Sequence, residues 1–174
     1  MKLTIVEYPD KRLKQKSLPV EKFDGGLHEL LDAMYDVMME SNGIGLAAIQ
    51  VAHPLNVLIL NIPDETGEQP RENLIEMINP VITAKEGETT YQEGCLSVPG
   101  FYEDVNRFEL LVVNYQDRDG NTKTLEADGL LSIAIQHEMD HLNGILFIDK
   151  LSYIRRKKFE KEYKKIQKEK KTAK

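Results

Sequence analysis

The sequence predicts an α+β fold, in which mixed and antiparallel strands pack around a central helix, with one further helix near each end of the chain. Three observations predict it: helical periodicity near the N-terminus, β-branched apolar runs through the middle, and helical periodicity again from about residue 128. Strands and helices do not alternate, which argues against a doubly wound sheet. A chain of 174 residues suits one domain with a real core.

The first predicted element is an amphipathic helix over residues 24–40. Asp24 can cap its N-terminus, and the turn-forming stretch SNG at 41–43 follows it. Its apolar residues recur at helical spacing and form one face: Leu27, Leu30, Leu31, Met34 and Met38.

Strands are predicted next, because the apolar runs become short and rich in β-branched residues. Residues 64–73 (DETGEQPREN) are polar and predict a loop, and Asp119-Gly120 predicts a tight turn into the segment TKTLEA. The predicted strands are 55–62, 74–84 and 109–116.

Two helices complete the prediction. The first begins at about residue 128, continues through His141 and ends at Gly144, and the last covers roughly residues 152–170. We therefore expect one body over residues 1–150 and a C-terminal helix over 151–174 attached to it.

The charges divide the chain in the same way. Residues 155–174 contain 11 Lys or Arg and 3 Asp or Glu, which leaves 12 basic against 26 acidic side chains in residues 1–154. The N-terminal apolar run is interrupted by Glu7, Asp10 and Lys11, so we expect no signal peptide, and no segment is apolar enough for a membrane span. These features predict a cytoplasmic protein that binds neither a membrane nor specific DNA sequences.

The segment QHEMDH at 136–141 predicts a metal site. His137 and His141 are four residues apart, so a helix places both imidazoles on one face with Glu138 beside them. The helix is apolar on that face, and buried imidazoles need partners.

Several readings of the third ligand are open. In a longer motif the third ligand would be a His at position 147, where this chain has Phe147. A thermolysin-like endopeptidase would use a downstream Glu, here Glu160 or Glu162, which lie among lysines of the basic tail. An alternative to an enzyme is a non-enzymatic, metal-stabilised ribosome-binding module, in which Glu138 is incidental.

Cys95, the single cysteine, is the better candidate. It stands in EGCLS at 93–97, and a thiolate with two imidazoles fills three tetrahedral positions and leaves the fourth for a water molecule. An open fourth position predicts catalysis.

Three motifs together give the chain a resemblance to a known family. GIGLAAIQ (43–50), EGCLS (93–97) and QHEMDH (136–141), in this order and spacing, resemble the signature motifs of peptide deformylases, which remove the N-formyl group from nascent bacterial polypeptides and release formate. The similarity extends over nearly the whole chain.

The resemblance implies roles for individual residues. A metal-bound water molecule would be the nucleophile, and Glu138 would act as general base and then general acid. The side-chain amide of Gln50 and the backbone N–H of Leu96 would stabilise the oxyanion. The substrate peptide would lie as an extended strand along Ile44 and Gly94, and the residues near the peptide and its methionine would be Ile44, Gly45, Gly94, Leu130, Ile133 and Ala134.

The resemblance also implies a metal ion and an ion pair, and the chain differs from many relatives at one position. Fe²⁺ is the expected ion, and Zn²⁺, Ni²⁺ or Co²⁺ are possible substitutes, one ion per chain. Asp140 would pair with Arg107, whereas Tyr102 stands where many relatives carry an Arg near the substrate. The basic C-terminal helix predicts contact with the ribosome, since similar enzymes dock there and an anionic surface attracts such a helix.

Overall fold

The computed structural model describes residues 1–172, and the helices and strands predicted from the sequence are present there in the predicted order, together with three strands that were not predicted, β1, β4 and β5. The helices are α1 (Gly25–Glu40), α2 (Gly129–Leu142) and α3 (Tyr153–Thr172). The strands are β1 (Gly45–Ala47), β2 (Val57–Leu60), β3 (Ile75–Glu86), β4 (Thr89–Cys95), β5 (Val98–Arg107), β6 (Leu110–Gln116) and β7 (Thr122–Ala127). Short 3₁₀ turns are η1 (Lys11–Lys14), η2 (Ala48–Val51), η3 (Arg71–Asn73) and η4 (Phe147–Lys150).

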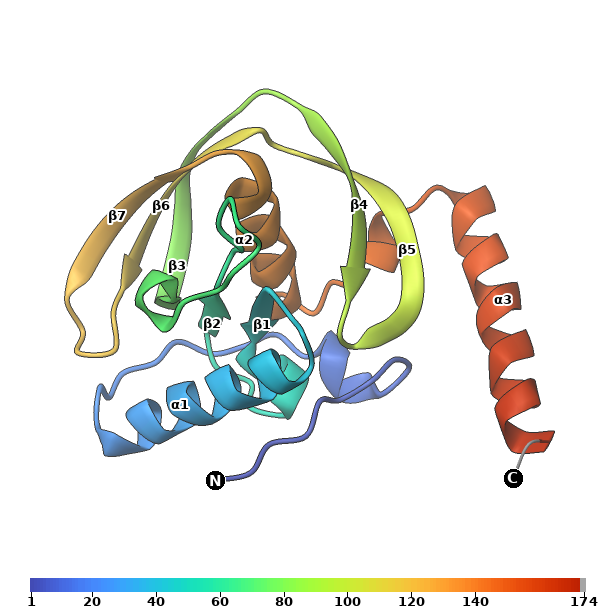
Figure 1. Ribbon diagram of the computed structural model, residues 1–174, viewed down its shortest axis with the longest axis horizontal. Coiled ribbons are helices and arrows are strands. Elements are labelled where there is room, and N and C mark those ends of the chain that lie inside the picture. The colour runs from blue at the N-terminus through green and yellow to red at the C-terminus, as the bar shows by residue number, and fades with distance from the viewer. Residues whose placement is uncertain (173–174) are drawn as a thin grey trace.

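The strands form two separate sheets around α2. One has five strands in the order β1-β2-β3-β6-β7, and the other contains β4 and β5 (Figure 1). The α+β class is confirmed, and the named strands pair antiparallel throughout. The sequence predicts both parallel and antiparallel pairing of strands. Within residues 1–172, the parallel pairing is limited to an isolated bridge between Leu18 and Leu55.

β2 lies between the two main helices, which explains its uninterrupted apolar sequence. Val57 and Ile59 pack in the cluster that contains the apolar face of α1, whereas Leu58 and Leu60 pack in the cluster that contains α2. Side chains alternate between the faces of a strand, so a strand covered on both faces needs apolar residues at every position. Burying each such side chain contributes about 1.5–3 kcal/mol.

The α1 helix forms as its sequence predicts. The Asp24 side chain accepts a hydrogen bond from the Leu27 backbone N–H, which caps the first turn. The five predicted apolar positions of the helix are all buried against the sheet. The apolar face therefore fixes α1 below the five-stranded sheet in Figure 1.

The sequence predicts no strand between residues 85 and 108, where the structure has the β4–β5 hairpin. Most of its side chains are exposed or half-buried, and its first five residues, Thr89–Glu93, are polar except Tyr91. An apolar alternation is therefore missing. Gln136 of α2 holds the end of this hairpin, because its side-chain amide bonds the backbone N–H and carbonyl of Phe108 at 2.9 and 2.8 Å.

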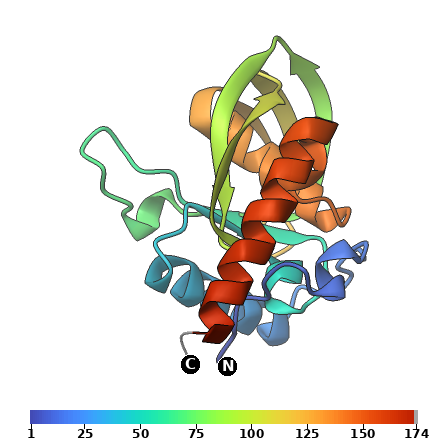
Figure 2. The same ribbon diagram turned by 90° about the vertical axis from the view of Figure 1, so that its right-hand side faces the viewer.

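The α3 helix packs along one side of the body through two aromatic residues (Figures 1 and 2). Phe159 is buried, and its ring lies 4.8 Å from that of Phe101 on β5 and 5.4 Å from that of Tyr8. Tyr163 is half-buried and donates to the Tyr8 carbonyl at 3.2 Å. Among residues 1–172, no helix combines the length and the apolar character needed to span a bilayer.

Candidate metal centre

Helix α2 brings the two histidines together at the centre of the molecule. Nε2 of His137 lies 3.2 Å from Nε2 of His141, and both side chains are buried. The spacing of four residues places them on successive turns of one helix face, as predicted.

Cys95, at the end of β4, completes the group. Its Sγ lies 3.3 Å from Nε2 of His141, and the three ligand atoms lie within 4.8 Å of one another. A tetrahedral ion with bonds of about 2.0–2.3 Å separates its ligand atoms by about 3.3–3.8 Å. The thiol and imidazole donors therefore fit a divalent ion in number, chemistry and spacing.

A buried charge network orients His137. Oε1 of Glu93 lies 2.9 Å from Nδ1 of His137, so the other ring nitrogen, Nε2, is free to face the ligand group. Arg107 donates two hydrogen bonds to Glu93, at 2.7 and 2.8 Å, and also pairs with Asp140, which confirms the predicted contact. Burial raises the pKa of Glu93, but the bonds from Arg107 and His137 outweigh this effect and lower it overall.

Glu138 faces the cavity, and its Oε1 lies 4.0 Å from Nε2 of His141, beyond hydrogen-bonding distance. Its side chain is buried, and Oε1 has no hydrogen-bond partner among the described residues. Burial raises the pKa of Glu138 to about 7. Gly45 makes room for this side chain, because a Cβ at Gly45 would lie only 2.6 Å from Oε2 of Glu138.

Gln50 is held in a fixed orientation beside the cysteine. Its Oε1 accepts from the Ala47 backbone N–H at 2.9 Å, and its Nε2 donates to Oγ of Ser97 at 3.0 Å. Nε2 also lies 3.5 Å from Sγ of Cys95. Two different partners thus fix which end of the amide points toward the candidate metal ligands.

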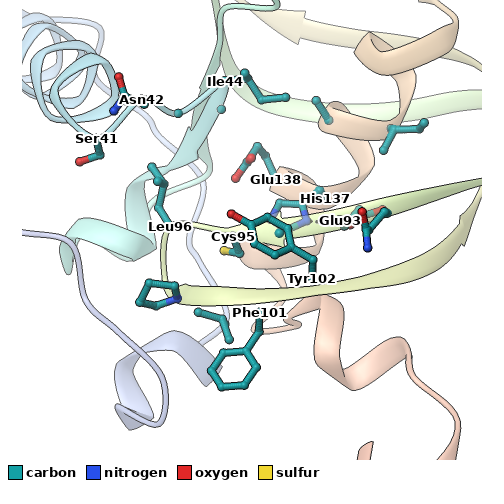
Figure 3. Close-up of a pocket in the computed structure, with 18 of the residues that line it drawn as sticks. Ser41, Asn42, Ile44, Glu93, Cys95, Leu96, Phe101, Tyr102, His137 and Glu138 are labelled. Atoms are coloured by element: carbon teal, nitrogen blue, oxygen red, sulfur yellow. Dashed lines mark hydrogen bonds and ion pairs between the residues drawn. The ribbon is translucent and has the colours of Figure 1, made fainter. Parts of the chain in front are cut away.

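A cavity of about 480 Å³ opens beside these groups (Figure 3). In Figure 3, Leu96 and Glu138 flank the centrally placed Cys95 and His137, and the ring of Tyr102 lies in front of these two residues in this view. The structure brings the predicted substrate-side residues together there, and the following all line the cavity: Ile44, Gly45, Gln50, Gly94, Leu96, Leu130, Ile133 and Ala134.

Two polar residues of the site, Glu93 and Ser97, are not predicted by the sequence. Glu93 and Ser97 lie inside the EGCLS motif, yet nothing in their spacing predicts that they contact His137 and Gln50. Tyr102, noted as a departure from relatives, lies against Gly94, where a Cβ would meet its ring at 2.5 Å. Residues of the three motifs therefore contact one another directly, although they lie far apart in the chain.

The alternative third ligands lie elsewhere. Glu160 pairs with Arg156 and Lys157 on α3. Among residues 1–172, the group of side chains that could hold a metal ion is Cys95, His137 and His141, without a carboxylate from α3. The thermolysin-like reading therefore finds no support in the geometry.

The fold and the site define a metal-dependent hydrolase with its HExxH motif on a central helix. Comparison with known proteins narrows the class: residues 2–157 match the family model described as polypeptide deformylase, so the chain belongs to the polypeptide deformylase family. The reaction of this family is removal of the N-formyl group from nascent polypeptides.

Individual relatives agree with this assignment. The chain is 59% identical to a peptide deformylase of Wolinella succinogenes over 95% of this chain and 97% of that protein. A crystal structure of a peptide deformylase from Legionella pneumophila has a TM-score of 0.86 at 38% identity, covering 96% of this chain and 98% of that one. A Met-Ala-Ser-bound class I type b peptide deformylase from Acinetobacter baumannii has a TM-score of 0.80 at 34% identity, covering 87% and 99%.

Proposed function

We propose that this chain hydrolyses the formamide of formyl-methionyl peptides with Glu138 as the group that carries the proton. The observation behind this assignment is the buried Oε1 of Glu138, which has no hydrogen-bond partner among the described residues and lies in the cavity beside the two histidines. Cys95, His137 and His141 would hold a divalent ion, which lowers the pKa of a coordinated water molecule toward neutrality. Glu138 takes a proton from the attacking water molecule and delivers it to the departing amine.

Two donors would stabilise the oxyanion that develops on the formyl oxygen. They are Nε2 of Gln50 and the backbone N–H of Leu96, the residue after the cysteine. Gln50 suits this role because Ala47 and Ser97 already fix its amide, so little reorganisation accompanies the reaction.

The substrate peptide would bind as an extended strand between two strand edges. β1 lies at the edge of the five-stranded sheet, and β4 pairs with β5 on one side only. Residues of both edges, including Ile44 and Gly94, line the cavity. Its apolar wall, formed by Ile44 and the α2 residues Leu130, Ile133 and Ala134, would take the methionine side chain. The Acinetobacter baumannii relative with bound Met-Ala-Ser supports a peptide of this kind.

We propose Fe²⁺ as the resident ion, with Zn²⁺, Ni²⁺ or Co²⁺ as substitutes. A thiolate and two imidazoles suit several of these metals, so the preference for iron follows from the family resemblance. Oxygen would then inactivate the enzyme, because it oxidises either the ion or the Cys95 thiolate.

Formate release from formyl-Met-Ala tests the proposal. Protein is purified anaerobically, and wild type is compared with Glu138→Gln, which keeps the shape of the side chain and removes its proton-carrying function. Glu126→Gln is the matched control, since Glu126 is an exposed glutamate on β7. We expect activity in the wild type and control and its loss in Glu138→Gln; full activity in Glu138→Gln would contradict the assigned role.

We further propose that residues 1–150 form the catalytic unit and that α3 docks on the ribosome in the cytoplasm, where nascent chains emerge. α3 packs on the body through Phe159 and Tyr163, which leaves its lysines exposed to solvent. Ribosomal RNA is a polyanion, so contact with these lysines would weaken as salt increases.

Co-sedimentation with ribosomes at increasing salt tests the docking of α3. One variant replaces exposed α3 lysines with Gln: Lys161, Lys164, Lys165 and Lys168. A control variant makes the same charge change on the body: Lys11, Lys14, Lys16 and Lys22. Selective loss of binding in the α3 variant is expected, and equal binding of both variants would contradict the proposal.

A further inference from the structure

We propose that Gln69 is a positioning residue that fixes the substrate-side edge of β1 by joining the open end of the β1–β2 ladder. The inference rests on the proposed placement of the peptide along Ile44. Gln69 lies in the loop between β2 and η3, which extends from the body in Figure 2. It is half-buried and is not among the residues that line the cavity.

The ladder between β1 and β2 does not end with its last regular pair. Gly45 pairs with Leu60, and the Asn61 backbone N–H then donates to the Ile44 carbonyl at 2.8 Å. Beyond Asn61, the side chain of Gln69 supplies the hydrogen bonds that backbone groups supply within the ladder. Its Nε2 donates to the Asn61 carbonyl at 2.7 Å and to the Gly43 carbonyl at 3.1 Å. One side-chain amide thus joins the two chain segments where backbone pairing stops.

The loop holds Gln69 in place from both sides. Nδ2 of Asn61 lies 3.3 Å from the carbonyl oxygens of both Gln69 and Pro70, which closes the base of the loop. Immediately after Pro70, the guanidinium of Arg71 stacks over the ring of Tyr35 on α1, 4.4 Å from its centroid. The amide of Gln69 is therefore anchored before any substrate arrives.

The joined segment lies where the proposed peptide would pair. Gly43 and Ile44 both line the cavity. Gly43 also approaches Leu96 closely, because a Cβ at Gly43 would lie 2.7 Å from Cδ1 of Leu96. Leu96 supplies one of the proposed oxyanion donors. The bond from Gln69 to Gly43 therefore holds the segment that lies against Leu96 in the cavity wall.

Loss of the amide donor would leave the carbonyls of Asn61 and Gly43 without this partner and free the segment to move. The ligand group of Cys95, His137 and His141 does not contact Gln69 among the described residues. We therefore expect weaker peptide binding with an unchanged chemical step, which appears as a higher KM at a similar kcat.

Two variants remove the donor and keep a side chain of similar size: Gln69→Glu and Gln69→Leu. The matched control is Glu68→Gln, because Glu68 is exposed, adjacent in sequence, and makes no side-chain hydrogen bond among the described residues. Each protein is assayed for metal content, for kcat and KM on formyl-Met-Ala-Ser and on formyl-Met, and for amide hydrogen exchange.

In both Gln69 variants we expect KM for formyl-Met-Ala-Ser to rise about tenfold, because both hydrogen bonds of the Gln69 amide are lost, with kcat within about twofold. Formyl-Met, which lacks the peptide groups beyond methionine, should be affected less. Metal content stays unchanged, and exchange accelerates over residues 43–47 but not over 57–60.

Wild-type KM in both variants, a fall in kcat alone, or equal acceleration of exchange throughout the protein would overturn the role of Gln69. Inactivity of the wild type on both substrates would be a different result. It would overturn the proposed function and with it the inference that depends on it.

Discussion

The carboxylate of Glu93 on β4 lies 2.9 Å from Nδ1 of His137 on α2, so the hairpin that carries Cys95 is tied to the helix that carries both histidines. Arg107 strengthens this connection, since its buried guanidinium bonds both Glu93 and Asp140. The relationship explains how a ligand on a largely exposed hairpin is held in register with two ligands on a buried helix. The role of the charge network of Glu93, Arg107 and Asp140 can therefore be tested without changing the metal ligands.

Glu93→Ala should destabilise the fold and weaken metal binding. It leaves the charge of Arg107 without its principal partner, a change that typically costs about 3–5 kcal/mol of unfolding free energy. Loss of the partner of His137 should also weaken metal affinity about 10- to 100-fold. Urea unfolding and chelator competition measure the two effects.

Glu103→Ala is the control for this prediction. Glu103, on β5, pairs with Arg155 at a longer distance of 3.9 Å near the surface, so its replacement should cost under about 1 kcal/mol. Equal losses in the two variants would mean that the buried network has no special role.

Gly45→Ala should reduce kcat sharply while the protein remains folded. The new Cβ would meet Oε2 of Glu138 at 2.6 Å, and the flexible carboxylate would move away from its position in the cavity. Gly25→Ala is the control, because a Cβ there has no neighbour within 4 Å. Steady-state assays and thermal unfolding distinguish displacement of Glu138 from general damage, and an active Gly45→Ala enzyme would argue against the role of Glu138.

Gln50→Ala should lower kcat about 10²- to 10³-fold with little change in KM, as expected for a donor that acts mainly in the transition state. Ser97→Ala should lower it less, since it removes one of two groups that fix the Gln50 amide. If Ser97→Ala were as damaging as Gln50→Ala, Ser97 would have a role beyond positioning.

The ligand assignment predicts opposite results for Cys95 and the carboxylates of α3. Cys95→Ala should lose the metal ion, whereas Glu160→Gln and Glu162→Gln should retain it. Metal analysis of anaerobically purified protein measures this directly. Retention in Cys95→Ala combined with loss in either α3 variant would favour the thermolysin-like alternative.

The ion pairs of Arg118, which lie away from the metal site, predict that the free energy of unfolding depends on pH. The guanidinium of Arg118 bonds Asp32 of α1 at 2.8 Å and Glu76 of β3 at 2.7 Å, and it lowers the pKa of Asp32. Because the folded pKa is lowered, this stabilisation is fully present above the unfolded pKa of about 3.9 and is lost as pH falls through the folded value.

Asp32→Asn removes that contribution at every pH. Below pH 4 the stability of the wild type should therefore approach that of the variant in urea unfolding. A difference between the two proteins that stays constant down to pH 2 would contradict the assignment.

The parts of the fold predicted from sequence are those with a strong local signal. The apolar spacing and the Asp24 cap predict α1, and the spacing of His137 and His141 predicts one face of α2, because both depend on helix geometry alone. The β4–β5 hairpin lacks such a signal, since its side chains are mostly exposed.

The supporting residues of the site could not be predicted from spacing. Glu93 bonds a residue 44 positions away, Ser97 one 47 positions away, and Gln69 one 26 positions away. These contacts depend on how the strands are arranged in space, which a local pattern does not encode. Cys95 was predictable because its chemistry completes an otherwise incomplete ligand set.

X-ray absorption at the metal edge of anaerobically prepared, zinc-loaded protein tests the central claim most directly. We expect one sulfur neighbour at about 2.3 Å and two imidazole nitrogens at about 2.0–2.1 Å, with one light atom in the remaining position. A coordination sphere made of nitrogen and oxygen alone would contradict it, because Cys95 would then not be a ligand.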